Sequence, residues 1–189
     1  MNRISIINAY ITKRNYLSYL ELGCQNDLCF NAINAPYKIG VDPAFGGTIR
    51  LTSDEFFAQN KDTFDICFID GMHHADYVYR DIINSLACLN EGGVIICHDM
   101  LPTKEVHQVT PRISKIWNGN CWKAWVKLRS EFTTLSMKVV DCDYGVGIIQ
   151  NGEQNLITIP AELTYEYFDK NRKELMNVIT VEEFKESLK

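Results

Sequence analysis

Apolar residues in the first half of the chain gather in short, nearly unbroken runs. Four such runs cover residues 16–23, 37–43, 64–71 and 92–99, and each of them ends at glycine, proline or aspartate. Near-continuous apolarity is typical of strands that are covered on both faces of a sheet. The pattern therefore predicts four buried strands, and we expect a fifth, weaker one at residues 49–52.

Helical patterns separate these runs. Residues 53–60 begin with residue types that cap a helix N-terminus, and residues 75–89 carry an apolar stripe along one helix face. The stripe consists of Val78, Ile82, Ser85, Leu86 and Leu89. Strand, helix and strand in this order imply right-handed crossovers and a parallel sheet.

The last third of the chain has a different pattern. Residues 134–141 alternate apolar and polar positions, a short turn follows, and residues 146–150 are again apolar, which predicts an antiparallel hairpin at the sheet edge. The connection 101–131 is long enough for a helix and a lid, and residues 164–189 have the pattern of one or two amphipathic helices. We therefore predict a single Rossmann-like, doubly wound α/β domain over residues 1–189, with a mainly parallel seven-stranded sheet, a C-terminal antiparallel hairpin and a helical tail.

Composition indicates which partners and which cellular environment to expect for this protein. The formal net charge is −5 and no basic stripe is present, which argues against nucleic acid as a partner. The seven cysteines are scattered and form no C-x-x-C pair, so a reducing, cytoplasmic environment is expected. The first residues lack the pattern of a secretion signal, and no apolar run approaches the ~18 residues of a membrane span. The sequence leaves open whether the chain forms a homo-oligomer.

In open parallel sheets, ligands bind outside the carboxyl ends of the strands. The first predicted strand ends with Glu21 and Gly23, and glycine lets the backbone approach a ligand. The turn continues through Cys24 to Asn26, and asparagine tolerates a left-handed conformation. Asp42 ends the second strand 19 positions after Gly23, where an acidic side chain binds ribose hydroxyls in nucleotide-binding folds. The alternative is an ordinary strand-to-helix turn, with Asp42 capping the turn before a proline.

The helix predicted at residues 53–60 offers two further candidates for cofactor contacts. Thr52 or Ser53 suits its N-cap, and Ser53 also lies at the ligand-binding edge. Asp54 follows in the first turn, from which a carboxylate could reach the adenine side of a nucleotide cofactor.

Acidic and imidazole side chains gather at the ends of two further strands. Asp70 and His73 follow the third long run, with His74 beside them, and His98 and Asp99 end the fourth. Because the carboxyl ends of neighbouring parallel strands meet at one edge, we expect these groups to lie close together. Such a cluster suits either a divalent cation or general-base chemistry. For each histidine alone, the alternative is a cap or surface position on the following helix.

Five stretches carry a resemblance to a known family: YLELG, IGVDP, TSDEFF, FDICFIDGMHHADYVYRDI and LNEGGVIICHDMLP. They resemble class I methyltransferases of the group related to glycan and sugar O-methyltransferases. The most specific part is D-G-x-H followed by R-D and later by H-D. The resemblance implies S-adenosylmethionine as cofactor and O-methylation of a sugar or other small hydroxylated acceptor. It also implies that Glu21, Gly23 and Asp42 line the cofactor, while Asp70 and His73 face the reacting end.

The resemblance further implies a magnesium ion. Related sugar methyltransferases hold Mg²⁺ with acids at the positions of Asp70 and Asp99, and His98 stands where a second acid would be. For the reaction, we hypothesise that His73 or His98 takes the proton of the acceptor hydroxyl while Asp70 orients it, with or without Mg²⁺. Two alternatives stay open. One is a metal-dependent hydrolase that uses the same cluster, and the other is a non-catalytic binding module, which the single glycine of the first turn would favour.

Aromatic and basic residues of the segment 101–131 have two interpretations each. The tryptophans either stack on a sugar or pack in the core; they are Trp117, Trp122 and Trp125. The basic residues either pair with an anionic substrate or lie on a solvated helix face; they are Arg112, Lys123 and Arg129.

Overall fold

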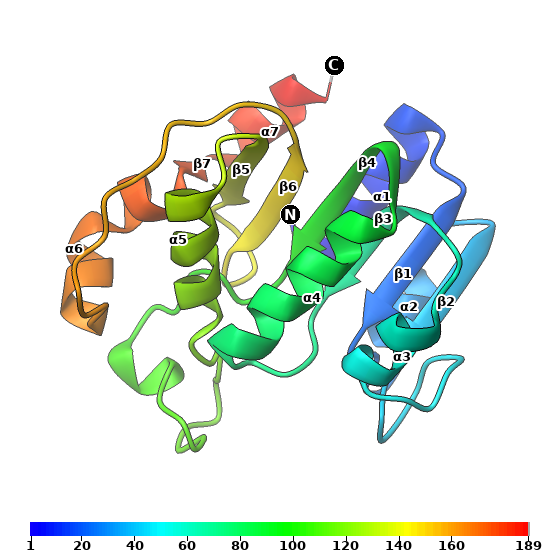
Figure 1. The fold of residues 1–189 in the computed structure, drawn as a ribbon, viewed down its shortest axis with the longest axis horizontal. Helices are drawn as coiled ribbons and strands as arrows, with labels where there is room; N and C mark the ends of the chain where they lie inside the picture. Colours follow the sequence, from blue (N-terminus) through cyan, green and yellow to red (C-terminus); the bar gives the residue numbers. More distant parts are fainter. Residues whose placement is uncertain (189) are drawn as a thin grey trace.

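The computed structural model describes residues 1–188, which form a central sheet with helices on both faces (Figure 1). The elements follow in the order α1 (Arg3–Arg14), β1 (Ser18–Leu22), α2 (Leu28–Ala32), β2 (Tyr37–Val41), α3 (Ser53–Gln59), β3 (Phe64–Ile69), α4 (Ala75–Ala87), β4 (Leu89–Cys97), a 3₁₀ turn (Glu105–His107), α5 (Cys121–Glu131), β5 (Leu135–Val140), β6 (Val146–Asn151), α6 (Tyr165–Met176), β7 (Val178–Ile179) and α7 (Val181–Ser187).

The seven strands of residues 1–188 lie in the order β2-β1-β3-β4-β6-β5-β7. Strands β1 to β4 pair in parallel, and β6 runs antiparallel to both of its neighbours, β4 and β5. The predicted doubly wound, mainly parallel sheet with a C-terminal antiparallel hairpin is therefore confirmed. Leu22 pairs with both Val41 and Ile69, and Ile69 pairs with Cys97. This register brings the residues that follow four strands to one edge of the sheet.

The strand predicted at residues 49–52 is wrong. Ile49 forms only an isolated bridge to Val41, and the chain then turns into α3. Thr52 is the N-cap of this helix and forms a capping box with Glu55, which leaves no length for a strand. The seventh strand is instead β7, whose two residues pair in parallel with the end of β5.

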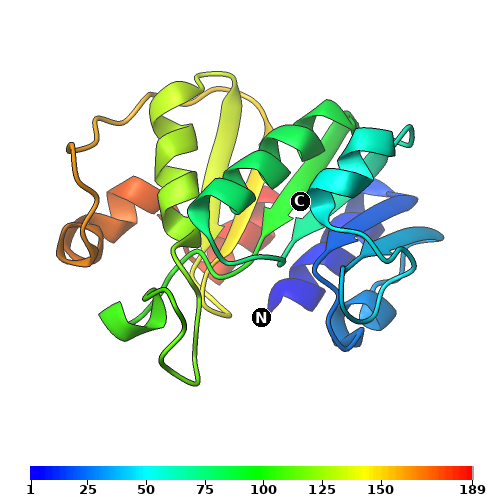
Figure 2. The same cartoon turned by 60° about the horizontal axis from the view of Figure 1, so that its bottom comes forward.

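Each inner strand buries both of its faces. On β3, Cys67 and Ile69 pack under α3, α4, α5 and α6, whereas Ile66 and Phe68 pack under α1, α2 and α7. This double burial explains why the strands appear as unbroken apolar runs in the sequence. Both views show the two helical layers, with α4 and α5 on one face and α1 and α7 on the other (Figures 1 and 2). Among residues 1–188, the structure contains no helix with the length and apolarity of a membrane span.

Helix α1 was not predicted from the sequence. It begins with a capping box between Asn2 and Ser5, and it buries Ile6, Ile7, Tyr10 and Ile11 along one stripe. The helix packs beneath the sheet, and its N-terminus reaches the edge where the strands end; Figure 2 shows the chain start there. One side chain of α1, Arg3, thereby reaches the candidate site.

Candidate functional site

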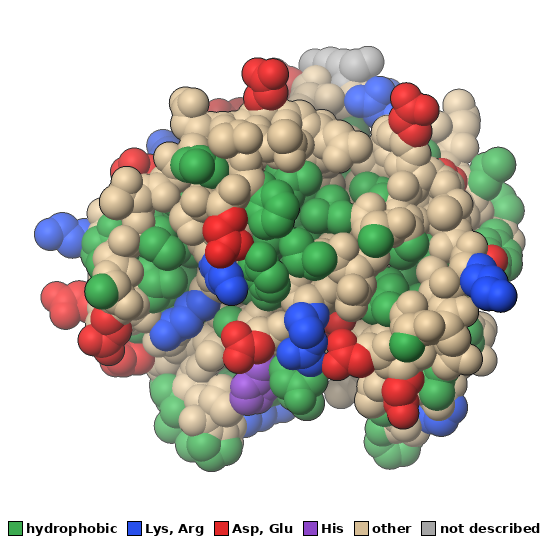
Figure 3. All heavy atoms as spheres, in the orientation of Figure 1, with side chains coloured by type: hydrophobic (Ala, Val, Ile, Leu, Met, Phe, Trp, Pro, Cys, Tyr) green, Lys and Arg blue, Asp and Glu red, His purple; other side chains and the backbone are tan. Residues whose placement is uncertain are grey.

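The carboxyl edge of the sheet lies in a hollow between two projecting loops (Figure 3). One loop covers residues 42–52 and the other covers residues 101–120, and Figures 1 and 2 show them on either side of the ends of β3 and β4. Large apolar side chains are exposed on both loops, namely Phe45 on the first and Ile113 and Ile116 on the second. The hollow between them lies where ligands bind in open parallel sheets.

Gly23 brings the end of β1 into contact with the end of β3. Its φ is 88°, and a Cβ atom at this position would lie 2.3 Å from the backbone oxygen of Asp70. The Gly23 N–H donates to the Val41 carbonyl at 2.9 Å, so the turn is also tied to β2. Glycine is therefore required here by both conformation and space.

The turn after Gly23 differs from the prediction in one respect. Asn26 was expected to take a left-handed conformation, but the left-handed residues are Gln25 and Asp27, with φ of 48° and 61°. Asn26 is exposed and its side chain accepts a hydrogen bond from the Leu28 N–H at 3.3 Å. Cys24 is buried with its thiol against the carbonyl oxygens of Glu21 and Val41, at 3.8 and 4.0 Å.

Asp42 holds two loops together. Its carboxylate accepts hydrogen bonds from the backbone N–H groups of Gln25 at 3.0 Å, Ala44 at 2.8 Å and Phe45 at 2.9 Å. Burial alone would raise the pKa of Asp42, but these hydrogen bonds outweigh it and lower the pKa. A carboxylate has about four acceptor positions, so about one remains for a ribose hydroxyl.

The other predicted cofactor residues have partners within the protein. The Glu21 carboxylate is buried and accepts a hydrogen bond from the Tyr19 hydroxyl at 2.5 Å; burial raises its pKa to about 7. Asp54 is exposed and pairs with Arg80 at 2.9 Å. Ser53 occupies the first turn of α3 after the Thr52 cap. Cofactor contacts of these residues stay predictions.

The acidic and imidazole groups predicted at the strand ends do lie together. His73 Nε2 is 3.4 Å from Asp70 Oδ1, and His73 Nδ1 is 3.4 Å from Asp99 Oδ2. His98 Nδ1 lies 3.3 Å from these same two oxygen atoms. Each imidazole therefore spans both carboxylates. Burial opposes the charge on Asp70, but the field of His98 and hydrogen bonds from both histidines hold the pKa of its carboxyl well below the usual value.

Two further residues of the cluster were missed by the sequence analysis. Arg3 Nε is 3.7 Å from Asp70 Oδ2, and Arg3 Nη1 is 2.9 Å from Asp143 Oδ2. Asp143 belongs to the β5–β6 turn, and its carbonyl oxygen accepts a hydrogen bond from His98 Nε2 at 2.8 Å. Burial opposes the charge on His98, but Asp70, Asp143 and Asp99 outweigh it and raise the pKa of His98 to about 12.

His73 is oriented by the loop before α5. Its Nδ1–H donates to the Trp117 carbonyl at 3.1 Å, and its ring stacks on the Trp117 indole with centroids 5.2 Å apart. Asn118 donates a side-chain hydrogen bond to Asp99 Oδ1, so this loop also fixes the second carboxylate. Burial opposes a charge on His73, but Asp70 and Asp99 outweigh it and raise its pKa, so the charged form donates from Nε2 to Asp70. Once His73 is neutral with its proton on Nδ1, Nε2 is an acceptor.

The tryptophans and basic residues of segment 101–131 divide between the two interpretations. Trp122 and Trp125 are fully buried in the core, whereas Trp117 lies at the candidate site. Arg129 is buried and donates to the carbonyl oxygens of Glu174 and Leu175 at the end of α6, so it is structural. Of the other two basic residues, Arg112 is exposed and donates to carbonyls of its own loop. Lys123 lines a cavity.

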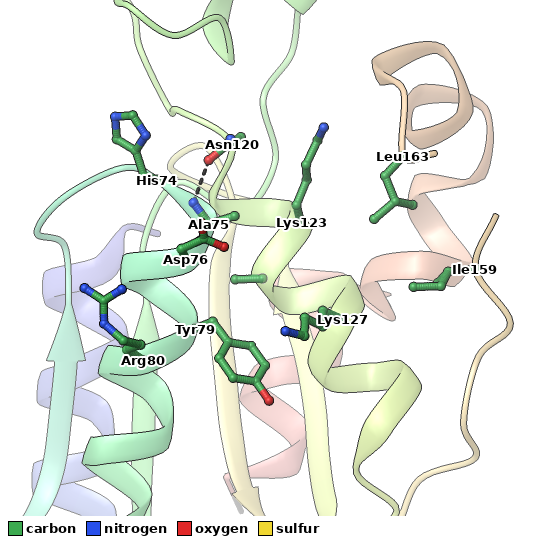
Figure 4. A pocket seen from close by; sticks show the side chains of 11 residues that line it. His74, Ala75, Asp76, Tyr79, Arg80, Asn120, Lys123, Lys127, Ile159 and Leu163 are labelled. Atoms are coloured by element: carbon green, nitrogen blue, oxygen red, sulfur yellow. Dashed lines mark hydrogen bonds between the residues drawn. The ribbon is translucent and has the colours of Figure 1, made fainter. Parts of the chain in front are cut away.

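This cavity lies between α4 and α5 and has a volume of about 530 Å³ (Figure 4). It begins at His74 and Asn120, next to the candidate site, since the Asn120 N–H donates to the His73 carbonyl at 3.2 Å. Its lining combines basic, aromatic and apolar side chains, including Lys123, Lys127, Tyr79, Arg80, Ile159 and Leu163.

The donor set at the strand ends does not fit magnesium. Mg²⁺ takes oxygen ligands in near-octahedral geometry, whereas the group whose ligand atoms lie within 4.8 Å of one another is Asp70, His73 and Asp99, which includes an imidazole. The two carboxylates are also already engaged, because His98 lies between them and Arg3 lies against Asp70. The prediction of magnesium at Asp70 and Asp99 therefore finds no support in the chemistry of the site.

Fold and site together resemble those of one class of protein. The strand order, with one antiparallel strand inserted beside β4, and the glycine turn and carboxylates at the strand ends are those of class I methyltransferases. Residues 39–100 match the family model described as a methyltransferase domain. The chain therefore has the fold of class I methyltransferases, and its segment 39–100 is similar in sequence to a methyltransferase domain.

Several solved structures have a similar fold. The O-methyltransferase from Bacillus cereus in complex with SAH has 12% identity and a TM-score of 0.57, over 78% of this chain and 79% of that chain. The SAH-bound methyltransferase PaMTH1 of Podospora anserina has 17% identity and a TM-score of 0.55, over 80% and 78%. A putative caffeoyl-CoA O-methyltransferase from Staphylococcus aureus has 16% identity and a TM-score of 0.56, over 80% and 85%. No curated protein matches this chain.

Proposed function

We propose that this protein is an S-adenosylmethionine-dependent methyltransferase that transfers the methyl group to a hydroxyl group of a small acceptor, such as a sugar. The observation that carries the proposal is the pairing of Asp70 with an oriented imidazole, His73, at the edge where this fold binds its cofactor. An alcohol is a weak nucleophile, so its attack needs a group that takes its proton. The similar structures described as O-methyltransferases favour the same chemistry.

His73 suits the role of the base better than His98. Nε2 of His73 lies beside Asp70, and no hydrogen-bond donor among residues 1–188 is directed at it, whereas Nδ1 donates to the Trp117 carbonyl. His98 is 7% exposed, and both of its nitrogens face oxygen atoms, one from Asp143 and the other from the carboxylate pair. In this assignment His73 takes the proton, Asp70 orients the acceptor hydroxyl, and His98 holds Asp70.

The charges of the cluster also suit a sulfonium cofactor. Asp70, Asp99 and Asp143 contribute three negative charges, and Arg3 and His98 contribute two positive ones. When His73 is neutral, as the role of base requires, one negative charge is left over; a proton on His73, whose pKa Asp70 and Asp99 raise, would cancel it. A cationic methyl donor bound beside Asp70 would compensate it, whereas the neutral product SAH would not, which favours release of the product.

The acceptor is proposed to extend into the cavity between α4 and α5. A sugar or similar hydroxylated molecule suits its mixture of Asn120, Tyr79 and basic side chains, and Lys123 and Lys127 would bind an acidic substituent. If so, Lys127→Gln raises the KM for the acceptor several-fold and leaves kcat unchanged. Lys170→Gln, on the exposed surface of α6, serves as the matched control. Equal KM values in the two variants would contradict this placement.

The proposed reaction is tested in two steps. Isothermal titration with S-adenosylhomocysteine should show one site per chain, and Asp42→Ala should weaken it; a folded protein that binds neither this compound nor S-adenosylmethionine would be a non-catalytic binding module. Transfer of a labelled methyl group from S-adenosylmethionine is then measured with a panel of sugars and phenols. His73→Gln should lower kcat by about 10²-fold or more without changing cofactor affinity. Full turnover in this variant would remove His73 from the base role.

A further inference from the structure

Arg3 is held at the cluster by two parts of the chain. Its guanidinium contacts Asp70 and Asp143, and its backbone N–H also donates to Asp143 Oδ2 at 3.0 Å. Helix α1 is anchored beneath the sheet by fully buried Ile6 and Ile7, so the position of Arg3 is fixed from the helix side as well. An arginine remains charged at every accessible pH, and Arg3 therefore supplies a permanent positive charge beside Asp70.

His98 occupies the position between the two carboxylates. Nδ1 is 3.3 Å from Asp70 Oδ1 and 3.3 Å from Asp99 Oδ2, and Nε2 donates to the Asp143 carbonyl. The oxygens that a divalent cation would need therefore face an imidazole N–H. His98 is buried, so it cannot turn out into solvent without opening the β5–β6 turn.

We propose that Arg3 and His98 take the place of a divalent cation in this protein. They compensate the charges of Asp70 and Asp99 from within the fold, and they hold Asp70 for the acceptor hydroxyl without a metal ion. Arg3 is a positioning residue, because it acts through Asp70 and Asp143. The catalytic consequence rests on the proposed methyl transfer, whereas the exclusion of metal is a property of the folded protein alone.

The test measures metal binding, so it does not depend on activity. The 189-residue protein without cofactor is titrated with Mn²⁺, a spectroscopic probe of magnesium sites, and binding is followed by water proton relaxation. We expect no saturable binding by the wild-type protein up to about 1 mM Mn²⁺. His98→Asp adds an oxygen ligand, and Arg3→Gln removes the competing charge. The double variant should bind one Mn²⁺ at least about tenfold more tightly than His98→Asp alone, and Mg²⁺ should compete for the site.

Several results would overturn the proposal. One is saturable Mn²⁺ binding by the wild-type protein that Asp70→Asn abolishes. Another is that folded His98→Asp and the folded double variant bind Mn²⁺ with equal affinity, or that neither of them binds it. Circular dichroism establishes whether the variants fold. If His98→Asp does not, Arg3→Gln is compared with Arg3→Lys: the former should gain at least about tenfold in Mn²⁺ affinity over the latter, and equal affinities refute the proposal.

Activity adds a separate readout. Methyl transfer by the wild-type protein should continue unchanged in EDTA and should not rise on addition of Mg²⁺. A protein that shows no methyl transfer at all contradicts the proposed function, but the Mn²⁺ titration still decides the role of Arg3 and His98.

Discussion

Replacement of Gly23 by alanine tests how the cofactor edge is built. The new Cβ would lie 2.3 Å from the Asp70 backbone oxygen, and the residue would keep a φ of 88°. The left-handed conformation costs an L-residue about 1–2 kcal/mol, and overpacking in a close contact costs about 1–3 kcal/mol. We therefore expect Gly23→Ala to lower the free energy of unfolding by about 2–5 kcal/mol. We also expect it to push the β1 turn away from Asp70.

Gly92 provides the matched control. Its φ is 74°, and a Cβ atom there would meet nothing within 4 Å, so Gly92→Ala carries only the conformational cost of about 1–2 kcal/mol. Urea unfolding followed by circular dichroism gives both free energies, and calorimetry gives the affinity for S-adenosylhomocysteine. Gly23→Ala should lose at least about tenfold in affinity, which is about 1.4 kcal/mol, while Gly92→Ala should keep it. Equal unfolding free energies, or unchanged affinity in Gly23→Ala, would refute the role given to this close approach.

Three further predictions concern burial and orientation. Burial raises the pKa of Asp81, 3% exposed, from 3.8 to about 6, so its stabilising contribution is complete below about pH 4 and is lost as the pH rises through 6. In urea unfolding, the free energy of unfolding of Asp81→Asn should be higher than that of the wild type by up to about 3 kcal/mol at pH 7 and equal to it at pH 4. A difference that does not change with pH would contradict this. Arg129→Met removes the donor to two carbonyls at the end of α6 and should cost about 2–3 kcal/mol of unfolding free energy; a cost below about 0.5 kcal/mol would show that water replaces it. Trp117→Ala removes the ring that orients His73 and should lower kcat about tenfold at constant cofactor affinity, whereas Trp117→Phe should retain most of the rate; equal rates in the two variants would rule out ring stacking as the cause.

The sheet could be predicted because its strands are covered on both sides. Burial of Cys67 and Ile69 on one face and of Ile66 and Phe68 on the other turns β3 into an unbroken apolar run. The segment 49–52 has the composition of a short strand, but the helix cap at Thr52 ends it after one bridge. Local propensity cannot show this outcome, since it depends on where the following helix begins.

The site was predictable only where it follows strands. Asp70, His73, His98 and Asp99 come directly after apolar runs, so the rule for parallel sheets places them at one edge. Arg3 and Asp143 lie 140 positions apart in the sequence, and no local pattern links them. The Asn2 cap and the spacing of the buried isoleucines are a signal for α1 in the sequence. They indicate that a helix forms, but not where in the fold this helix packs.

The position of α1 also bears on how the protein is prepared for experiments. The chain starts beside the hollow, and the Asn2 cap and Arg3 lie within the first turn of the helix (Figure 2). An affinity tag fused ahead of Met1 would emerge next to the cluster of carboxylates, and a histidine tag would place additional imidazoles and any metal that they carry at that point. A tag after the C-terminal helix α7, or an N-terminal tag removed by protease, leaves the surroundings of Arg3 unchanged. Metal titrations and rate measurements on this protein should therefore be made on such preparations.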